Sequence, residues 1–289
     1  MTGLIKLKEL SLLFKRAGIE DHAKEATSLL TETLCIDKVA LYTGSLEIDE
    51  KISKEIDSLA ARRVQGEPLH YIIGHVNFYG LKMHVGKGVL IPRPETELIV
   101  EEAIRLISGR DGSLAVLDLC TGSGCIALAV AKGIQRAAVF GIDRSEKALS
   151  YARRNARCNG IGNVVFIEGN LFNPLNADAQ FDCIISNPPY IRSNDISGLQ
   201  KEISYEPIEA LDGGEDGLEF YRRILDEAPR YLKKNGIVIL EISFDQTNDI
   251  RRLAAQHGFR NIVFVKDYAG IERIFIGEGP ELCRSVFPE

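Results

Sequence analysis

The sequence lacks the features that mark a membrane-spanning, secreted or zinc-binding protein. No window approaches the ~18 consecutive apolar residues of a membrane helix. The N-terminus is charged and amphipathic, without the apolar core of a signal peptide. The 5 histidines show no metal-ligand spacing. The 6 cysteines form no CxxC pair, so we expect no bound metal. We expect the cysteines to be free thiols, at Cys35, Cys120, Cys125, Cys158, Cys183 and Cys283. These absences predict a cytoplasmic protein without membrane contact.

The charge pattern offers little support for a nucleic-acid-binding surface. The formal net charge is −6, whereas a large phosphate-binding face needs clustered Lys and Arg. Arg153, Arg154 and Arg157 share one expected helix, and we interpret them as a solvated face. We therefore expect no direct nucleic-acid partner.

Residues 1–70 are typical of a small helical bundle. Apolar residues recur at helical spacing in residues 4–14 and again in residues 23–34. Asp49 is the expected N-cap of a third helix that continues to Ala60. No turn-bounded β-branched run interrupts this region, so we expect a separate helical domain here.

Strands and helices alternate after a linking hairpin at residues 71–91, where β-forming residues flank Tyr79-Gly80. The alternation predicts an α/β domain at residues 92–289, with a mostly parallel sheet covered on both faces. A short loop at residues 267–270 joins the last two strands, so the last strand should be antiparallel. The expected strands are 115–119, 138–142, 163–167, 181–186, 236–241, 261–266 and 272–277, and the expected helices are 124–133, 145–159, 217–232 and 246–257.

A glycine-containing turn joins the first strand of this domain to its first helix. Gly122 and Gly124 allow close backbone approach to a ligand, and the helix N-terminus offers N–H groups to a carboxylate. The turn alone also satisfies the dinucleotide pattern G-x-G-x-x-A. Asp118 would crowd a pyrophosphate but can face a sulfonium or ammonium group, and Asp143 can accept both ribose hydroxyls. These carboxylates favour S-adenosylmethionine, while a glycine turn with a helix-capping Asp is the alternative.

The stretch Asn187-Pro188-Pro189-Tyr190 follows a buried strand and indicates the chemistry. Two prolines with φ of about −65° make the loop stiff, so it holds Asn187 and the Pro188 carbonyl in place. Their oxygens can accept both hydrogens of an NH₂ group, and Tyr190 offers a flat stacking face. An amide nitrogen is a poor nucleophile because its lone pair is conjugated, and two fixed acceptors let it pyramidalise toward a methyl group. We predict methyl transfer to a planar amide or amine nitrogen, with Asn187, Pro188 and Tyr190 as catalytic residues; a merely structural turn is the alternative.

These segments together resemble the protein-(glutamine-N5) methyltransferases of class-1 peptide chain release factors, known as PrmC or HemK. The resemblance covers nearly the whole chain, including Tyr71-Ile-Ile-Gly and Tyr205-Glu-Pro-Ile-Glu-Ala-Leu-Asp-Gly-Gly, and is most specific at Ile91-Pro-Arg-Pro-Glu-Thr-Glu. It implies a seven-stranded, Rossmann-like class I methyltransferase sheet, S-adenosyl-L-methionine as methyl donor and S-adenosyl-L-homocysteine as product. The implied acceptor is the glutamine of a Gly-Gly-Gln loop in the release factor, held by the helical N-terminal domain. We expect a monomer.

Further residues are expected to take part in the site, some from their place in the sequence and others because the resemblance implies it. Arg93 and Glu95 are expected to shape the pocket mouth, although Glu95 or Thr96 capping the next helix is an equal alternative. Glu206-Pro207 is expected to line the substrate entrance, or else to lie in a surface loop. The implied glutamine-binding residues are Asn187, Pro188, Pro189 and Tyr190. The implied cofactor-binding residues are Cys120, Thr121, Gly122, Ser123, Gly124, Asp143 and Asn187.

Two positions depart from the family pattern. The first loop glycine is Cys120 here, and its Cβ is tolerable only if φ is negative and the side chain points away from the cofactor. The acidic residue that meets the adenine amino group is Asn170, whose carbonyl can still accept that hydrogen bond. Because this amide can flip, we expect looser adenine selection, with Leu171 packing on the adenine. Neither change touches the reacting nitrogen.

Three rival functions remain open from the sequence. A nucleic-acid adenine-N6 or guanine-N2 methyltransferase can use a similar Asn-Pro-Pro-Tyr loop, but it should carry a basic groove or an RNA-binding module. An NAD-dependent oxidoreductase can share the glycine turn and a carboxylate at the position of Asp143. A non-catalytic adaptor can retain the fold alone.

Overall fold

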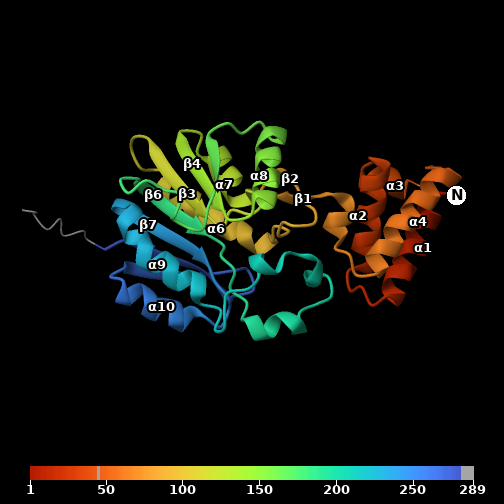
Figure 1. The fold of residues 1–289 in the computed structure, drawn as a ribbon. Helices are drawn as coiled ribbons and strands as arrows, with labels where there is room; N and C mark the ends of the chain where they lie inside the picture. The colour runs from red at the N-terminus through yellow and green to blue at the C-terminus, as the bar shows by residue number, and fades with distance from the viewer. Residues whose placement is uncertain (44–45, 281–289) are drawn as a thin grey trace, which may run out of the picture. The chain divides into compact units, whose positions relative to one another are not determined.

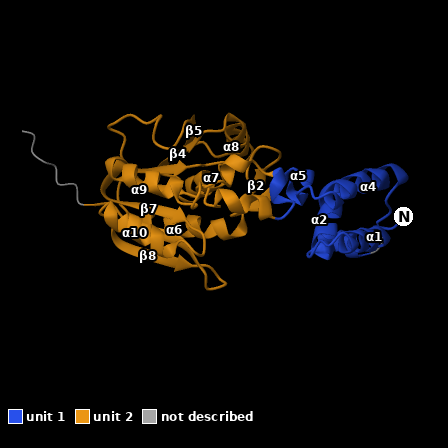
Figure 2. Cartoon of the chain, turned by 60° about the horizontal axis from the view of Figure 1, so that its bottom comes forward, with its two compact units in different colours: residues 1–75, 200–205 blue, residues 76–199, 206–289 orange. Residues whose placement is uncertain are grey.

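The computed structural model describes residues 1–43 and 46–280, and the chain divides into two compact units (Figure 2). Unit 1 comprises residues 1–75 and 200–205, and unit 2 comprises residues 76–199 and 206–289. The inclusion of residues 200–205 in unit 1 had no counterpart in the sequence pattern. Cys283 lies outside the described residues, and the other five cysteines are free thiols. No helix in the described ranges is both long and apolar enough to span a bilayer.

Unit 1 is helical, and its apolar faces enclose one core that includes the fully buried Leu10, Phe14 and Leu30. As predicted, Asp49 caps its helix, because its carboxylate accepts a hydrogen bond from the Ile52 N–H at 2.8 Å. Two short helices, α3 and α5, were not expected. The helices are α1 (Gly3–Arg16), α2 (His22–Leu34), α3 (Lys38–Tyr42), α4 (Glu50–Val64) and α5 (Leu69–Ile73).

Residues 200–205 join unit 1 through a buried guanidinium. Arg63 of α4 is only 2% exposed and donates hydrogen bonds to Glu25 at 2.5 and 3.0 Å and to Glu202. The Tyr205 hydroxyl donates to the Gln65 carbonyl at 3.3 Å. Residues 200–205 are therefore bound to α4 and the residue after it by hydrogen bonds between groups about 140 residues apart in sequence.

The expected hairpin forms, but over fewer residues than the sequence indicated. Strands β1 (His75–Phe78) and β2 (Leu81–His84) pair across Tyr79 and Gly80, whose φ angles of 47° and 68° suit a tight hairpin turn. Residues 71–73 were assigned to this β region and instead belong to α5, which follows Pro68 and ends at the left-handed Gly74.

The large sheet of unit 2 has seven strands in the order β5-β4-β3-β6-β7-β9-β8, as Figure 1 shows in part. The first five in this order are parallel, and β9 is antiparallel to both neighbours, so both predictions for the sheet are confirmed. The strands are β3 (Leu114–Leu119), β4 (Ala137–Asp143), β5 (Val164–Glu168), β6 (Phe181–Ser186), β7 (Leu232–Glu241), β8 (Arg260–Lys266) and β9 (Glu272–Glu278).

Helices cover both faces of this sheet (Figure 1). Their apolar side chains form two cores. One core includes residues of α6 and α7, and the other includes residues of α9 and α10. Because β3, β4, β6 and β7 are parallel, their carboxyl ends meet at one edge, where ligands bind in such sheets. The helices are α6 (Glu97–Ile107), α7 (Cys125–Gly133), α8 (Glu146–Cys158), α9 (Glu219–Tyr231) and α10 (Thr247–Gln256), with 3₁₀ turns η1 (Pro94–Thr96), η2 (Ser193–Gly198), η3 (Ile203–Tyr205) and η4 (Ile208–Ala210).

Candidate active site

A cleft opens in unit 2 at the carboxyl ends of the parallel strands. It contains about 910 Å³ of empty space, part of it open to solvent, which suits a small organic ligand. The predicted site residues that line it are Arg93, Cys120, Thr121, Gly122, Ser123, Asp143, Asn170, Leu171, Asn187 and Pro189. Those outside this lining are Asp118, Gly124, Pro188, Tyr190, Glu95 and Glu206. Pro207, expected with Glu206 at the substrate entrance, also lines the cleft. Lining residues that the sequence analysis missed include Gly88, Val89, Leu90, Pro92, Thr96, Ile126, Arg144, Glu209, Ala210 and Phe220.

The turn between β3 and α7 places three residues in the left-handed region. Cys120, Gly122 and Gly124 have φ angles of 57°, 55° and 80°. The expectation of a negative φ at Cys120 is therefore wrong. Backbone N–H groups of the turn are tied to the end of β4, with Thr121 donating to the Ile142 carbonyl at 3.0 Å, and these bonds impose the conformation despite the Cβ.

Gly124 meets a packing requirement in the same turn. A Cβ there would lie 2.9 Å from the Phe166 ring and 3.0 Å from the Ala152 Cβ. The glycine therefore lets the start of α7 approach β5 and α8 closely.

Asp143, at the end of β4, is tied to the neighbouring backbone through both of its carboxylate oxygens. Its Oδ2 accepts a hydrogen bond from the Gly122 N–H at 2.8 Å, and its Oδ1 accepts one from the Ser145 N–H at 2.9 Å. Burial raises the pKa of Asp143, and these two N–H donors act in the opposite direction. Each oxygen retains a lone pair for a further donor, so the carboxylate can hold a ribose diol at the cleft wall.

Asp118 lies beneath the turn and braces it. Its Oδ2 accepts hydrogen bonds from the Thr121 hydroxyl at 2.5 Å and from the Ala127 N–H at 3.1 Å. Its Oδ1 is buried and has no hydrogen-bond partner among the described residues. Burial raises the pKa of Asp118 to about 7. A buried, unpartnered carboxylate oxygen behind the loop is suited to a cationic ligand, which would lower the free energy of its ionised form.

The adenine end of the expected site lies at Asn170 and Leu171. Arg223 of α9 donates a hydrogen bond to the Asn170 Oδ1 at 3.1 Å, so the amide flip considered from the sequence is restrained. Leu171 is 3% exposed, has a φ of 53° and packs into the core beside α9. Arg223 was missed because it lies 53 residues away in sequence without any local motif.

Asn187 begins the proline loop after β6, and a side chain from another element orients it. Its Nδ2 donates to the Thr96 Oγ1 at 3.3 Å. Thr96 occupies the N-cap position of α6, but its side chain makes no capping hydrogen bond, so the capping alternative is wrong for Thr96. Glu95 is exposed and directly precedes Thr96 in the turn η1.

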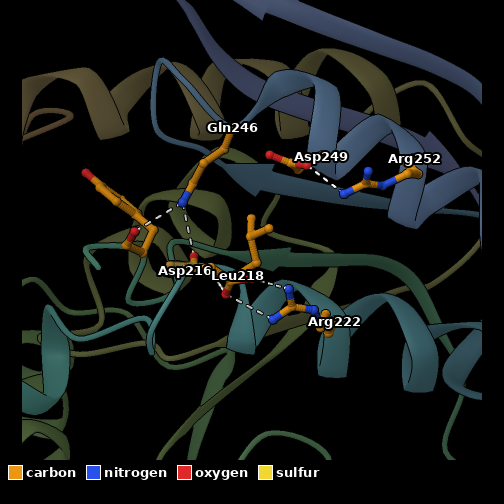
Figure 3. Close-up of polar contacts among 8 residues, drawn as sticks. Asp216, Leu218, Arg222, Gln246, Asp249 and Arg252 are labelled. Carbon is orange, nitrogen blue, oxygen red and sulfur yellow. Dashed lines mark hydrogen bonds and ion pairs between the residues drawn. The ribbon is translucent and has the colours of Figure 1, made fainter. Parts of the chain in front are cut away.

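The far end of the proline loop is held by Gln246, as Figure 3 shows. The Gln246 Nε2 donates to the carbonyls of Tyr190 and Gly217, both at 3.1 Å. A Cβ at Gly213 would lie 2.7 Å from the Tyr190 Cα, and one at Gly217 would lie 2.5 Å from the Tyr190 carbonyl oxygen. The glycines of Asp212-Gly213-Gly214-Glu215-Asp216-Gly217 thus allow this segment to pack on the loop, a requirement that only the tertiary structure reveals.

Glu206 is buried and connects its own segment to residues 91–93 by hydrogen bonds, an arrangement called the Glu206 clamp below. Glu206 is 4% exposed, so the surface-loop alternative is wrong. Its oxygens accept hydrogen bonds from the Ile91 N–H at 2.9 Å and from the Arg93 guanidinium at 2.5 Å. The clamp joins two walls of the cleft, and the neighbouring Pro207 supplies lining directly.

Comparisons with known proteins cover both units of the chain. Residues 6–74 match the family described as PrmC N-terminal domain, and residues 110–256 match the family described as methyltransferase domain. A release factor glutamine methyltransferase of Thermodesulfovibrio yellowstonii is 47% identical over 280 residues, which span 96% of this chain and 98% of that protein. One of Geobacter sulfurreducens is 42% identical over 90% of each chain.

A solved structure supports the fold of unit 2. The T. thermophilus 16S rRNA methyltransferase RsmC, in complex with AdoMet and guanosine, superposes with a TM-score of 0.52 and 17% identity, covering 71% of this chain and 49% of that one. At this identity the likeness concerns the fold alone.

Proposed function

The chain belongs to the release factor glutamine methyltransferase family, and we propose that it methylates the side-chain amide nitrogen (N5) of the glutamine in the Gly-Gly-Gln loop of class-1 release factors. The observation that carries this proposal is 47% identity across nearly the full length of both proteins. The geometry agrees, because Asn187 lines a cleft of suitable size at the carboxyl ends of the strands. The proposal also includes a cytoplasmic, monomeric enzyme.

We propose S-adenosyl-L-methionine as the methyl donor, since bound there it supplies an electrophilic methyl group on a sulfonium. Asp143 would accept hydrogen bonds from its ribose, while Asn170 and Leu171 would meet the adenine. The N-terminus of α7 would face its carboxylate, because free N–H groups and the helix dipole favour an anion there. The unpartnered Oδ1 of Asp118 supports a cation nearby.

The acceptor amide would be activated by the proline loop. The Asn187 Oδ1 and the Pro188 carbonyl would accept the two N–H hydrogens, while Tyr190 stacks on the planar amide. Burial raises the pKa of Tyr190 to about 12, so its hydroxyl stays neutral at physiological pH. Fixed acceptors favour the pyramidal nitrogen as its charge develops, which is a large catalytic term. No strong base is required, because the methylated nitrogen loses its proton readily.

Unit 1 would bind the release factor. Support comes from the match of residues 6–74 to the PrmC N-terminal domain. The core of this unit is separate from the two cores beneath the helices of unit 2.

The test is methyl transfer from labelled cofactor to a class-1 release factor, to bulk RNA and to DNA. We expect label on one glutamine of the release factor, located by mass spectrometry. Replacement of Asn187 by Ala should lower kcat by about 10²–10³, as loss of one fixed polar group does elsewhere. Label found only in nucleic acid, or tighter equilibrium binding of NADH than of S-adenosylhomocysteine, would contradict the proposal. A loss in kcat below about threefold would exclude the role of Asn187.

A further inference from the structure

Two buried polar side chains lie near Asn187: Glu241 at the end of β7 and Thr96 at the N-cap of α6. Ser186 of β6 pairs with Leu240 of β7 in a parallel arrangement. The residues that follow them, Asn187 after β6 and Glu241 at the end of β7, therefore lie side by side. Glu241 is 5% exposed, and Thr96 is 2% exposed. Neither Thr96 nor Glu241 was singled out as a site residue from the sequence.

A hydrogen bond joins two of these three side chains, and the third is a carboxyl beside them. The Asn187 Nδ2 donates to the Thr96 Oγ1 at 3.3 Å. Burial raises the pKa of Glu241 to about 7, and the nearby polar side chains of Thr96 and Asn187 act in the opposite direction. The Glu241 Oε2 has no partner in the part of the chain that the structure describes. The carboxyl therefore has acceptor capacity to spare next to the reactive loop.

The polarity of these groups distinguishes the two ends of the Asn187 amide. The Asn187 NH₂ end already donates to the Thr96 Oγ1. When ionised, Glu241 offers acceptors alone, and its Oε2 has no partner among the described residues. A flipped amide would place the Asn187 oxygen beside this carboxylate, a repulsive arrangement in a buried site.

We infer that Glu241 and Thr96 are positioning residues that keep the Asn187 oxygen turned toward the methyl acceptor, an inference that rests on the proposed function. The two ends of an Asn amide have nearly the same shape, so packing alone hardly distinguishes them. With the wrong end in the cleft, the loop would present N–H donors to an NH₂ group that needs acceptors. Thr96 and Glu241 act through Asn187 and need not touch the substrate.

The test compares Thr96→Val, Thr96→Ser and Glu241→Gln in the full-length enzyme. Valine keeps the shape of Thr96 but removes its hydroxyl, so kcat should fall about tenfold, less than on loss of Asn187 because some amides still adopt the productive orientation. Serine keeps the hydroxyl and should retain at least about half of kcat. Glutamine adds a donor beside Asn187 and should lower kcat by about fivefold or more.

Equilibrium binding of S-adenosylhomocysteine separates positioning from a general loss of structure. Its Kd should stay within about twofold in all three variants, so that the effect is confined to kcat. If Thr96→Val and Glu241→Gln both keep kcat within about twofold of the wild type, the inference is overturned. If the wild type transfers no methyl group to release factors, the proposed function fails first and the inference falls with it.

Discussion

Among single residues, Asp118 stabilises the β3–α7 turn through the hydrogen bonds that its carboxyl accepts. Its Oδ2 holds the Thr121 hydroxyl and the Ala127 N–H, while its Oδ1 lies buried without a partner among the described residues. Keeping such a group ionised in the folded protein is unfavourable because water no longer solvates it. Asp118 therefore links the stability of unit 2 to pH.

Replacement of Asp118 by Asn should make stability less dependent on pH. The pKa of Asp118 is about 7 in the folded protein against an ordinary 3.8. Between about pH 4 and 7 the unfolded chain is ionised while the folded protein keeps the proton, so the wild-type free energy of unfolding falls as pH rises, by at most about 1.4 kcal/mol per pH unit. The neutral Asn lacks this loss and can accept the same two hydrogen bonds.

Urea unfolding at about pH 5 and pH 8 measures the effect as a difference between variant and wild type. Glu241, whose pKa is also raised to about 7, contributes in the same direction to both proteins and cancels in this difference. The free energy of unfolding of the variant minus that of the wild type should be larger at about pH 8 than at about pH 5. A difference that is the same at both pH values would show that Asp118 is ionised in the folded state.

Asn187 illustrates what a local motif conveys about a residue and what it omits. The sequence Asn187-Pro188-Pro189-Tyr190 predicts a stiff loop and an amide available for hydrogen bonding. Which end of the amide faces the cleft depends on Thr96, 91 residues earlier, and on Glu241 of β7. Such partners are invisible in a sequence because hydrogen-bond polarity is set by groups that only folding brings together.

Among the elements, the β3–α7 turn departs most from expectation. Its left-handed Cys120 was predicted to have a negative φ, because only glycine adopts the left-handed region without penalty. The turn hydrogen bonds to β4 require the observed backbone whatever the side chain. The strain at Cys120 is thus imposed by pairing between elements.

Cys120→Gly should be more stable than Cys120→Ala by about 1 kcal/mol, because alanine keeps the Cβ that the left-handed backbone disfavours. Both variants remove the sulfur, so their comparison isolates the backbone effect. At an ordinary position the order is reversed, since glycine is about 0.5–1 kcal/mol worse than alanine. Chemical denaturation of the two variants under identical conditions would measure the difference in their free energies of unfolding. Equal or greater stability of the alanine variant would contradict a left-handed backbone at Cys120.

Long elements were predictable and short ones were not. The seven strands and four helices expected after residue 114 match the structure to within a few residues, because their apolar periodicity extends over several turns or strand pairs. Helices α3 and α5 have 5 residues each, too few for a period to show. Close packing between elements, such as that of Gly217 on Tyr190, also leaves no periodic signal.

At the scale of the whole molecule, the chain path is the main finding that the sequence did not indicate. Residues 200–205 belong to unit 1, although the chain on both sides of them belongs to unit 2. Arg63 holds them through Glu202 while also binding Glu25. One buried cation therefore secures three segments of unit 1.

Arg63→Met should destabilise unit 1, since it leaves Glu25 and Glu202 without their shared cation. We expect a loss of about 1–3 kcal/mol, below the ~3–5 kcal/mol for a fully buried pair because Glu202 is partly exposed. Hydrogen exchange should quicken in residues 200–205 and in α4, while S-adenosylhomocysteine binding should change by less than about twofold.

Arg62→Met is the matched control for this prediction. The neighbouring Arg62 is 43% exposed and pairs only locally with Glu67, so its loss should cost less than about 1 kcal/mol. Equal destabilisation by the two variants would show that the buried network at Arg63 has no special role.

The sequence by itself determined the order of the elements, the parallel sheet with its antiparallel last strand, and the loops that carry Gly122 and Asn187. These features depend on interactions between residues close in the chain: apolar periodicity, glycine turns and proline stiffness. Only the tertiary structure decided the orientation of Asn187, the clamp at Glu206, the strain at Cys120 and the place of residues 200–205. Each of these depends on hydrogen bonds or ion pairs between distant segments, and their geometry exists only once the strands and helices have packed.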